Sequence, residues 1–254
     1  MTHSEQQSIL NLAMATGELL LTSGAETYRV EETIDRMCQS RGVINESFVT
    51  PSVILVTGLI DNIPYTNMKR VQPQPIDLHK IDEANSFARS FTSQAMPLSE
   101  AWEELERVSH SRQYPLAISL LGGGLSVAGF AVLFGAPWFQ FPIGFLIGAL
   151  LQLFMVTIMP LRLNFFLRNI VASFVVTILI HLLSRLFPVA INPMIIGAIM
   201  PLVPGVAITN SVRDTLTGDF LSGLTRASEA IFIALGIAFG VGVGLVLMTG
   251  VLPL

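Results

Sequence analysis

The alternation of apolar and polar positions changes character near residue 115. Before that point, apolar side chains recur at the spacing of an amphipathic helix, as Val30, Ile34 and Cys38 do. Between the helical stretches lie short runs with the composition and turn residues of β-strands. The pattern predicts a small α+β domain, with helices at 5–22, 24–42, 76–95 and 100–109 and strands at 43–50, 52–60 and 63–71.

Beyond residue 114 the apolar runs become long enough to cross a bilayer. About 20 apolar residues span a hydrocarbon core of roughly 30 Å. Four runs reach this length easily, and a shorter one is broken by Pro201 and Pro204. We therefore expect a membrane protein, with a cytoplasmic α+β domain at 1–114 followed by a transmembrane helical domain at 115–254. The five expected spans are about 115–135, 139–160, 165–187, 190–206 and 226–250.

The arginines predict how these spans are oriented. Cytoplasmic loops of membrane proteins carry an excess of Lys and Arg. With residues 1–114 inside, six arginines fall on the inner side and one on the outer, and no secretory signal precedes the first apolar run. The expected protein is multi-pass in the bacterial inner membrane, with its N-terminus in the cytoplasm and its C-terminus outside. The inner set is Arg107, Arg112, Arg162, Arg168, Arg213 and Arg226, and the outer one is Arg185.

Composition narrows the function classes. Only 13% of the residues are charged, and residues 1–114 contain 9 Lys or Arg against 15 Asp or Glu, so a nucleic-acid-binding role is disfavoured. The single cysteine, Cys38, excludes an internal disulfide and is expected to be an inert core thiol. Hydrolase motifs and histidine clusters are absent from the sequence, so we expect no enzyme activity, catalytic residue, metal or cofactor.

The stretch from Pro201 to Ala230 is the exception to this apolar background. It holds Asp214, Asp219 and Glu229, the only acidic residues after Glu106. Charged residues beside a proline-broken helix are typical of solute sites in membrane transporters. The expected substrate-binding residues are Pro204, Gly205, Thr209, Asn210 and Arg213. Two structural alternatives stay open: Arg213, Asp214, Asp219 and Arg226 in an ordinary cytoplasmic loop, and Glu229 extending to the membrane surface.

Glycine spacing and three acidic residues of the N-terminal domain give weaker indications of helix packing and of an exposed helix face. Gly144 with Gly148, and the stripe of Gly236, Gly240 and Gly244, are spaced for close helix packing. The acids Glu26, Glu31 and Asp35 recur at helical spacing, which is usually a solvated helix face.

Two motifs bring out a family resemblance. GAETYRVEETI at the second helix and PGVAITNSVRDTLTGDFLSGLTRASEA before the last span resemble the threonine/serine exporter family, and more closely the large subunit of its split two-component form. The resemblance implies export of small amino acids driven by the proton motive force, or of dicarboxylates such as succinate in split members. It also implies a separate small membrane subunit supplying a second transmembrane half, for which the glycine stripe offers a docking face. The positions it carries over are Gly24, Glu26 and Glu31 in the cytoplasmic domain, and Pro204, Gly205, Asn210, Arg213, Asp214, Asp219 and Glu229.

The favoured hypothesis is thus an exporter subunit in the lipid bilayer, moving a small amino acid or a dicarboxylate. Arg213 would be the counter-ion for a solute carboxylate, and Asp214, Asp219 or Glu229 the proton-coupled acid. The alternatives are a membrane-anchored enzyme that acts through Glu26 and Glu31 of the cytoplasmic domain, and a structural or sensing protein without solute flux.

Overall fold

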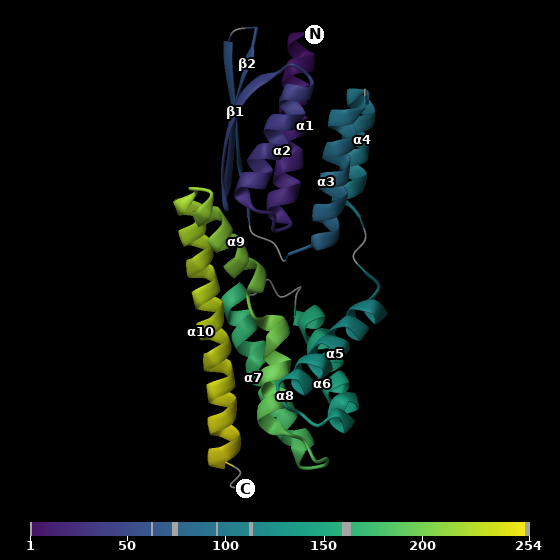
Figure 1. Cartoon of the computed structure of the whole chain (residues 1–254), viewed down its shortest axis with the longest axis vertical. Helices are drawn as coiled ribbons and strands as arrows, with labels where there is room; N and C mark the ends of the chain where they lie inside the picture. Colours follow the sequence, from purple (N-terminus) through teal and green to yellow (C-terminus); the bar gives the residue numbers. More distant parts are fainter. Residues whose placement is uncertain are drawn as a thin grey trace. The chain divides into compact units, whose positions relative to one another are not determined.

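The chain divides into two units, each with its own core (Figure 1). Unit 1 comprises Met1–Arg112 and Ile208–Ala227, and unit 2 comprises Gln113–Ala207 and Ser228–Leu254. The computed structural model describes residues 2–61, 63–72, 76–94, 96–111, 114–158 and 164–251. Arg112 and Arg162, two arginines of the orientation argument, lie outside these ranges.

Unit 1 is built on a three-stranded antiparallel sheet of order β1-β2-β3. Helices α1 and α2 pack on one face of the sheet, and α3 and α4 form a pair beside them (Figure 1). The sheet buries alternate residues of its central strand, Ile54, Val56 and Ile60, against these helices. The elements are α1 (His3–Thr22), α2 (Thr27–Ser40), β1 (Ile44–Thr50), β2 (Val53–Ile60), β3 (Ile63–Arg70), α3 (Leu78–Ser93) and α4 (Leu98–Ser109).

The core of unit 1 confirms the periodicity seen in the sequence. Val30, Ile34 and Cys38 are fully buried on the inner face of α2. Because burial disfavours the thiolate, it raises the pKa of the Cys38 thiol to about 12. Cys38 is therefore a core residue, as expected, and the α+β prediction for this part of the chain is confirmed.

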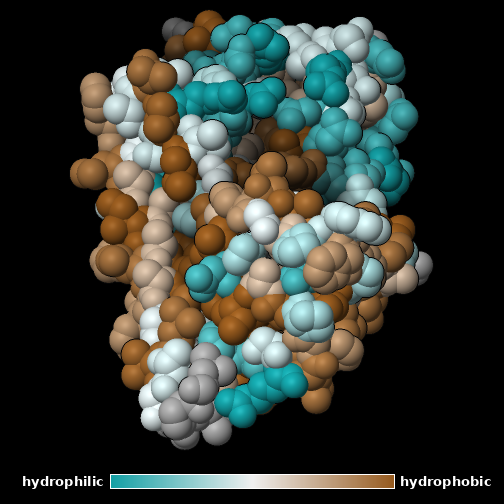
Figure 2. Space-filling model, turned by 60° about the horizontal axis from the view of Figure 1, so that its bottom comes forward, coloured by the Kyte–Doolittle hydropathy of each residue, from teal (hydrophilic) through white to brown (hydrophobic). Residues whose placement is uncertain are grey.

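Unit 2 is helical. In the part of the chain that the structure describes, four helices are long and apolar enough to cross a membrane, and the last of them, α10, begins in unit 1. A fifth span is reached if α8 and α9, which are bent by 54° at a short break, count as one. Large apolar side chains cover much of its surface (Figure 2), as expected of helices that face lipid. The elements are α5 (Leu116–Leu133), η1 (Trp138–Gln140), α6 (Phe141–Ile158), α7 (Phe165–Ser184), α8 (Ile191–Ile199) and η3 (Met200–Leu202).

Helices α9 (Gly205–Leu216) and α10 (Phe220–Val251) differ from the expected boundaries. The segment between the expected fourth and fifth spans, which holds Arg213, Asp214 and Asp219, is almost entirely helical. The last helix begins at Phe220 rather than at 226, because hydropathy marks only the apolar part of a helix and misses its polar first turns. The proline break itself is confirmed, since α9 starts directly after Pro204.

Glycines set the close helix contacts of unit 2. A side chain on Gly148 of α6 would meet the backbone of Gly123 in α5, so the predicted close packing of the glycine pair is confirmed. The stripe of Gly236, Gly240 and Gly244 packs against α7 in the same way. The expectation that this stripe is open for a partner subunit was therefore wrong, because α7 already covers it.

Candidate functional site

The two sequence motifs meet inside unit 1, at the connection between α1 and α2. Helix α1 ends at Thr22, and Gly24 then takes a φ of +98°, a left-handed conformation that favours glycine. Glu26 occupies the N-cap position of α2 without capping the helix through its side chain. The carboxylate of Glu26 is therefore available to residues far along the chain.

Three side chains from the segment 208–227 hold three consecutive residues of this connection. Asn210 Nδ2 donates to the carbonyl oxygen of Gly24 at 3.2 Å. Arg226 Nη2 donates to the carbonyl oxygen of Ala25 at 2.8 Å. Arg213 Nη1 donates to Glu26 Oε1 at 2.6 Å. These contacts bring both motifs into one site, although the paired residues are 186 to 201 positions apart in the sequence.

Arg213 and Glu26 form the accessible side of the site. The Glu26 side chain is 12% exposed, whereas that of Arg213 is 57% exposed. A second arginine, Arg29, lies 3.6 Å from the other carboxylate oxygen of Glu26. The Arg213 guanidinium can therefore meet a solute carboxylate without first leaving a buried environment.

Asp214 and Arg226 form the buried side. Arg226 Nε lies 3.2 Å from Asp214 Oδ2, and the two side chains are 10% and 0% exposed. Neither carboxylate oxygen of Asp214 accepts a hydrogen bond of standard geometry from the described residues, although the Thr27 hydroxyl is close enough to act on this carboxylate as a side-chain donor, and Arg226 Nε faces Oδ2 without the direction of a hydrogen bond. A buried ion pair recovers its desolvation cost only when its remaining polar atoms are satisfied. In this pair, buried polar atoms of Asp214 and Arg226 therefore remain without hydrogen bonds of standard geometry.

Asp219 has a different environment from Asp214. Its Oδ1 accepts from the backbone N–H of Ser222, which makes it the N-terminal cap of α10. Its Oδ2 accepts from the Thr27 hydroxyl at 3.1 Å. Both carboxylate oxygens are occupied, so Asp219 fastens α10 to the start of α2.

Glu31 and Asp35 extend the acidic side of α2 toward the sheet. Glu31 Oε1 accepts from the backbone N–H of Val49 on the edge strand β1, and Asp35 Oδ1 accepts from Asn45 and Ser47. The expectation of a solvated acidic face was therefore wrong for these two residues. Partial burial raises the pKa of Glu31, against the lowering effect of the hydrogen bond from Val49, and the carboxylates of Asp219, Asp35 and Asp214 add to the increase.

The other predicted site residues lie elsewhere. Thr209 is exposed on α9, and Pro204 and Gly205 belong to unit 2. Glu229 also belongs to unit 2, where it is exposed and lines a shallow pocket of about 390 Å³ with Asn164 and Phe166. The structure thus brings together Gly24, Glu26, Asn210, Arg213, Asp214 and Asp219 in unit 1, with Glu31 close by.

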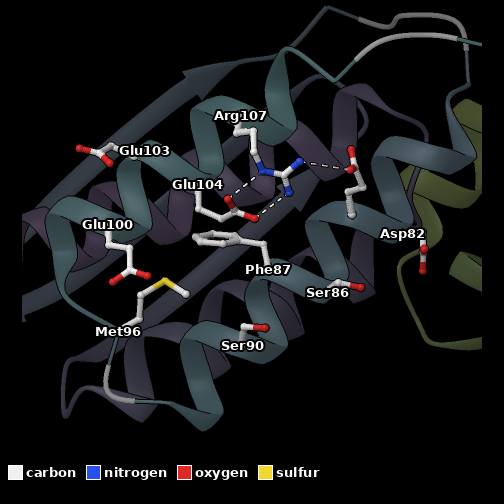
Figure 3. A pocket seen from close by; sticks show the side chains of 10 residues that line it. Asp82, Ser86, Phe87, Ser90, Met96, Glu100, Glu103, Glu104 and Arg107 are labelled. Carbon is white, nitrogen blue, oxygen red and sulfur yellow. Dashed lines mark hydrogen bonds and ion pairs between the residues drawn. The ribbon is translucent and has the colours of Figure 1, made fainter.

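Unit 1 also has a groove of about 650 Å³ between α3 and α4 (Figure 3). Its rim is acidic, and Arg107 within it is bound to Glu104 and Glu83. The hydrogen bonds from Arg107 lower the pKa of Glu104. No residue of either motif lines this groove.

Sequence reasoning missed three participants of the site. Thr27 and Ser222 were not singled out, although both fall inside the quoted motifs. Arg226 was considered as a loop or orientation residue and as an i, i+3 partner of Glu229, but not as the partner of Asp214. The signal for Asp219 as a helix cap was also present, since an Asp directly before a helix is a common cap. Missing it followed from placing the start of the last helix at 226.

These features define the class of protein. Several helices long and apolar enough to cross a bilayer, together with a proline-broken helix pair, are those of a multi-pass membrane protein. The sequence from residue 11 to 248 matches the model of the ThrE family, described as "Putative threonine/serine exporter". The chain belongs to this family.

Similar proteins include two kinds of transporter. The "Threonine/serine exporter" of Corynebacterium glutamicum is 24% identical over 96% of this chain and 52% of its own length. The chain thus spans about half the length of the first curated relatives it matches. The "Probable succinate transporter subunit YjjP" is 26% identical in Klebsiella aerogenes and 24% in Escherichia coli K12, over 93% and 95% of those proteins. No solved structure matches the chain.

Proposed function

We propose that this chain is a subunit of an exporter of small polar metabolites, and that the paired charges of unit 1 couple proton and solute binding. The observation that carries the proposal is the buried Asp214–Arg226 ion pair, in which the aspartate side chain is fully buried and its arginine partner nearly so. A buried, under-satisfied carboxylate beside an arginine is typical of sites that exchange a proton or bind a charged solute.

Asp214 is the preferred proton-coupled acid among the three candidates. Asp219 uses both oxygens in structural hydrogen bonds, and Glu229 is exposed. Protonation of either would leave the ion pair of Asp214 and Arg226 intact. Protonation of Asp214 would remove the charge that Arg226 faces and so change how the segment 208–227 holds the α1–α2 connection.

Two solute classes have support. The family description and the C. glutamicum relative favour threonine or serine. Succinate is the alternative, because the relatives named as succinate transporter subunits align with this chain over nearly the whole length of both proteins. Arg213 and Arg226 can each oppose a carboxylate, which both classes of solute carry.

The word "subunit" in the names of those relatives supports a companion membrane protein for this chain. We place unit 1 in the cytoplasm and the helices of unit 2 in the inner membrane. The arginine distribution supports this orientation, and it would present the charged site to solutes inside the cell.

Efflux from loaded cells tests the proposal. Cells expressing the full chain with its candidate companion are loaded with threonine and serine, or with succinate, and external solute is followed over time. We expect efflux that requires the chain, stops with a protonophore, and is lost in Asp214→Asn while the protein remains in the membrane.

Glu104→Gln is the matched control, because Glu104 lies in the separate groove of unit 1, and it should export like the wild type. Absence of flux for both solute classes, with both proteins present in the membrane, would refute the exporter proposal. Flux that is insensitive to the protonophore would refute proton coupling alone.

A further inference from the structure

The outer face of the β-sheet in unit 1 is uncovered. Helices α1 and α2 pack on the inner face, where Val49, Ile54 and Val56 are buried (Figure 1). Because side chains alternate between the two faces of a strand, the register assigns twelve residues, four from each strand, to the outer face. Within the described chain, none of these twelve is buried. They are Ile44, Glu46, Phe48 and Thr50 of β1, Val53, Leu55, Thr57 and Leu59 of β2, and Pro64, Thr66, Met68 and Arg70 of β3.

Apolar side chains dominate this outer face. Seven of the twelve are apolar, and six of these form two rows that run across all three strands. Phe48 and Met68, at the two ends of one row, are 52% and 64% exposed. An antiparallel sheet with one face in water normally places polar residues on that face, and a contiguous exposed apolar patch marks an interaction surface. The rows are Ile44, Leu59 and Pro64, and Phe48, Leu55 and Met68.

Only two of the twelve positions on the outer face are charged, and their charges are opposite. Glu46 lies on the edge strand β1 and Arg70 on the other edge strand, β3, and both are exposed. The register separates them by two strand spacings and four residues, which is roughly 10 Å across the sheet and 13 Å along it. The two side chains are therefore too far apart to pair with each other within one copy. Whatever covers this face must supply an opposite charge to each of them, because a buried unpaired charge is costly.

We propose that a second copy of this chain covers the face, sheet against sheet, about a two-fold axis that pairs Glu46 of each copy with Arg70 of the other. A two-fold contact presents the same patch on both sides, so the pairing occurs twice and leaves neither charge unpaired. Two sheets packed face to face lie about 10 Å apart and bury the side chains between them. A lipid surface or an apolar helix would cover the apolar rows but would leave both charges without partners.

The position of the axis follows from the strand register. Leu55 lies on the central strand, and its row is halfway between the row of Glu46 and the row of Arg70. The midpoint between the two charges therefore falls at Leu55, so the axis passes close to this residue. Phe48, which neighbours Leu55 in the same row, then lies against the central strand β2 of the second copy.

Site-specific photocrosslinking in cell membranes tests this arrangement with the full chain. The photoreactive analogue benzoylphenylalanine replaces Phe48, which it resembles in shape, and reacts with whatever its side chain touches. We expect a crosslinked dimer of this chain in which the attached peptide, identified by mass spectrometry, comes from β2. The same analogue at Trp102, which is exposed on α4 outside the sheet, should give no such product. A crosslink from position 48 to a lipid or to a different protein, or the absence of a crosslink, would overturn the proposal.

Charge reversal tests the pairing itself. Glu46→Arg and Arg70→Glu should each weaken association of the purified chain at least roughly tenfold, because two like-charge contacts replace two ion pairs. The double variant, which carries both changes, should recover association. This recovery also shows that the single variants fold. Glu103→Arg makes the same change of charge at an exposed position of α4 and should associate like the wild type. Native mass spectrometry over a range of protein concentrations measures the dimer fraction.

Two results of this second experiment would overturn the proposed contact. One is a dimer that forms equally well in the wild type and in both single variants, since the contact would then lie elsewhere. The other is a double variant that remains as weakly associated as the single ones. The contact is independent of the proposed export, because the efflux experiment can fail while the dimer forms, and the dimer can be absent while solute is exported.

Discussion

At the scale of single residues, the environment distinguishes two aspartates that the sequence presents as equals. Asp219 caps α10 and accepts from Thr27, so its charge has a structural use. Asp214 lies five positions earlier, is fully buried, and faces Arg226 as its ion-pair partner. The difference comes from where α10 begins, because only the residue before its first turn can cap it.

Glu31 provides a pH-dependent prediction. Because its pKa is raised in the folded protein, the folded state binds more protons than the unfolded state between the usual carboxyl pKa and the raised one. Stability falls as the pH rises through that window, and the charged carboxylate is a constant cost above it. Glu31→Gln removes this cost and keeps an oxygen for the Val49 N–H. We expect the variant to have a higher Tm than the wild type at pH 7.5, and nearly the same Tm at pH 4.

Thermal unfolding in detergent, followed by the fluorescence of Trp102 and Trp138, measures both values. Glu32→Gln is the control, since Glu32 is exposed beside Arg36, and its effect should stay within about 0.5 kcal/mol. A lower Tm for Glu31→Gln at pH 7.5 would show that the charge itself, and not only an acceptor oxygen, stabilises the contact with β1.

At the scale of elements, the α9–α10 pair acts as a clamp on the α1–α2 connection. Its contacts divide into an accessible pair, Glu26–Arg213, and a buried pair, Asp214–Arg226. Breaking a buried pair leaves one charge uncompensated, whereas an exposed pair contributes at most about 1 kcal/mol. The two pairs should therefore respond very differently to substitution.

We expect Arg226→Met to lower the free energy of unfolding by about 3–5 kcal/mol, because it strands the Asp214 charge. Adding Asp214→Leu should recover most of this loss, short of the hydrogen bond to Ala25. Arg213→Gln should cost less than Arg226→Met, because Arg213 is 57% exposed and Arg29 still lies 3.6 Å from the Glu26 carboxylate. Chemical denaturation of the purified protein measures all three. A double variant no more stable than Arg226→Met would argue that Asp214 is not charged in the folded protein.

Helices α5 and α6 can approach closely because glycines, which have no side chain, lie at their contact. Gly148→Ala places a methyl group against the backbone of Gly123, and overpacking of this kind costs about 1–3 kcal/mol. Gly129→Ala is the matched control, because nothing lies within 4 Å of the added atom. The Tm should fall for the first variant and stay level or rise for the second, and equal effects would contradict the close contact.

The sequence predicted the elements better than the site. Helical spacing identified the buried face of α2, and apolar length identified the four long helices, because burial and lipid each impose a regular pattern. The site was only partly predictable. The motifs indicated Glu26, Arg213 and Asp214, but no local pattern shows that Asn210 reaches Gly24, since this contact depends on how distant parts of the chain pack.

At the scale of the whole molecule, the number of membrane spans decides on which side of the membrane the C-terminus lies. With the N-terminus in the cytoplasm, five spans put the C-terminus outside, whereas a re-entrant α8–α9 pair leaves four spans and puts it inside. The arginine distribution favours five. A reporter fused after Leu254 that is active only outside the cytoplasm should therefore be active. The same reporter fused after Ser109 should be silent, and activity there would overturn the orientation.

The clamp on the α1–α2 connection also bears on biosynthesis. Asn210, Arg213 and Arg226 contact residues that are synthesised 186 to 201 positions earlier. Contacts between residues so far apart in the sequence form late in folding. The chain also leaves the ribosome from its N-terminus at about 5–20 residues per second. Once Gly24, Ala25 and Glu26 have been synthesised, roughly 10–40 s therefore pass before their partners in the chain exist. The site can assemble only after the earlier membrane helices have been made, so a chain that stalls during insertion never acquires it.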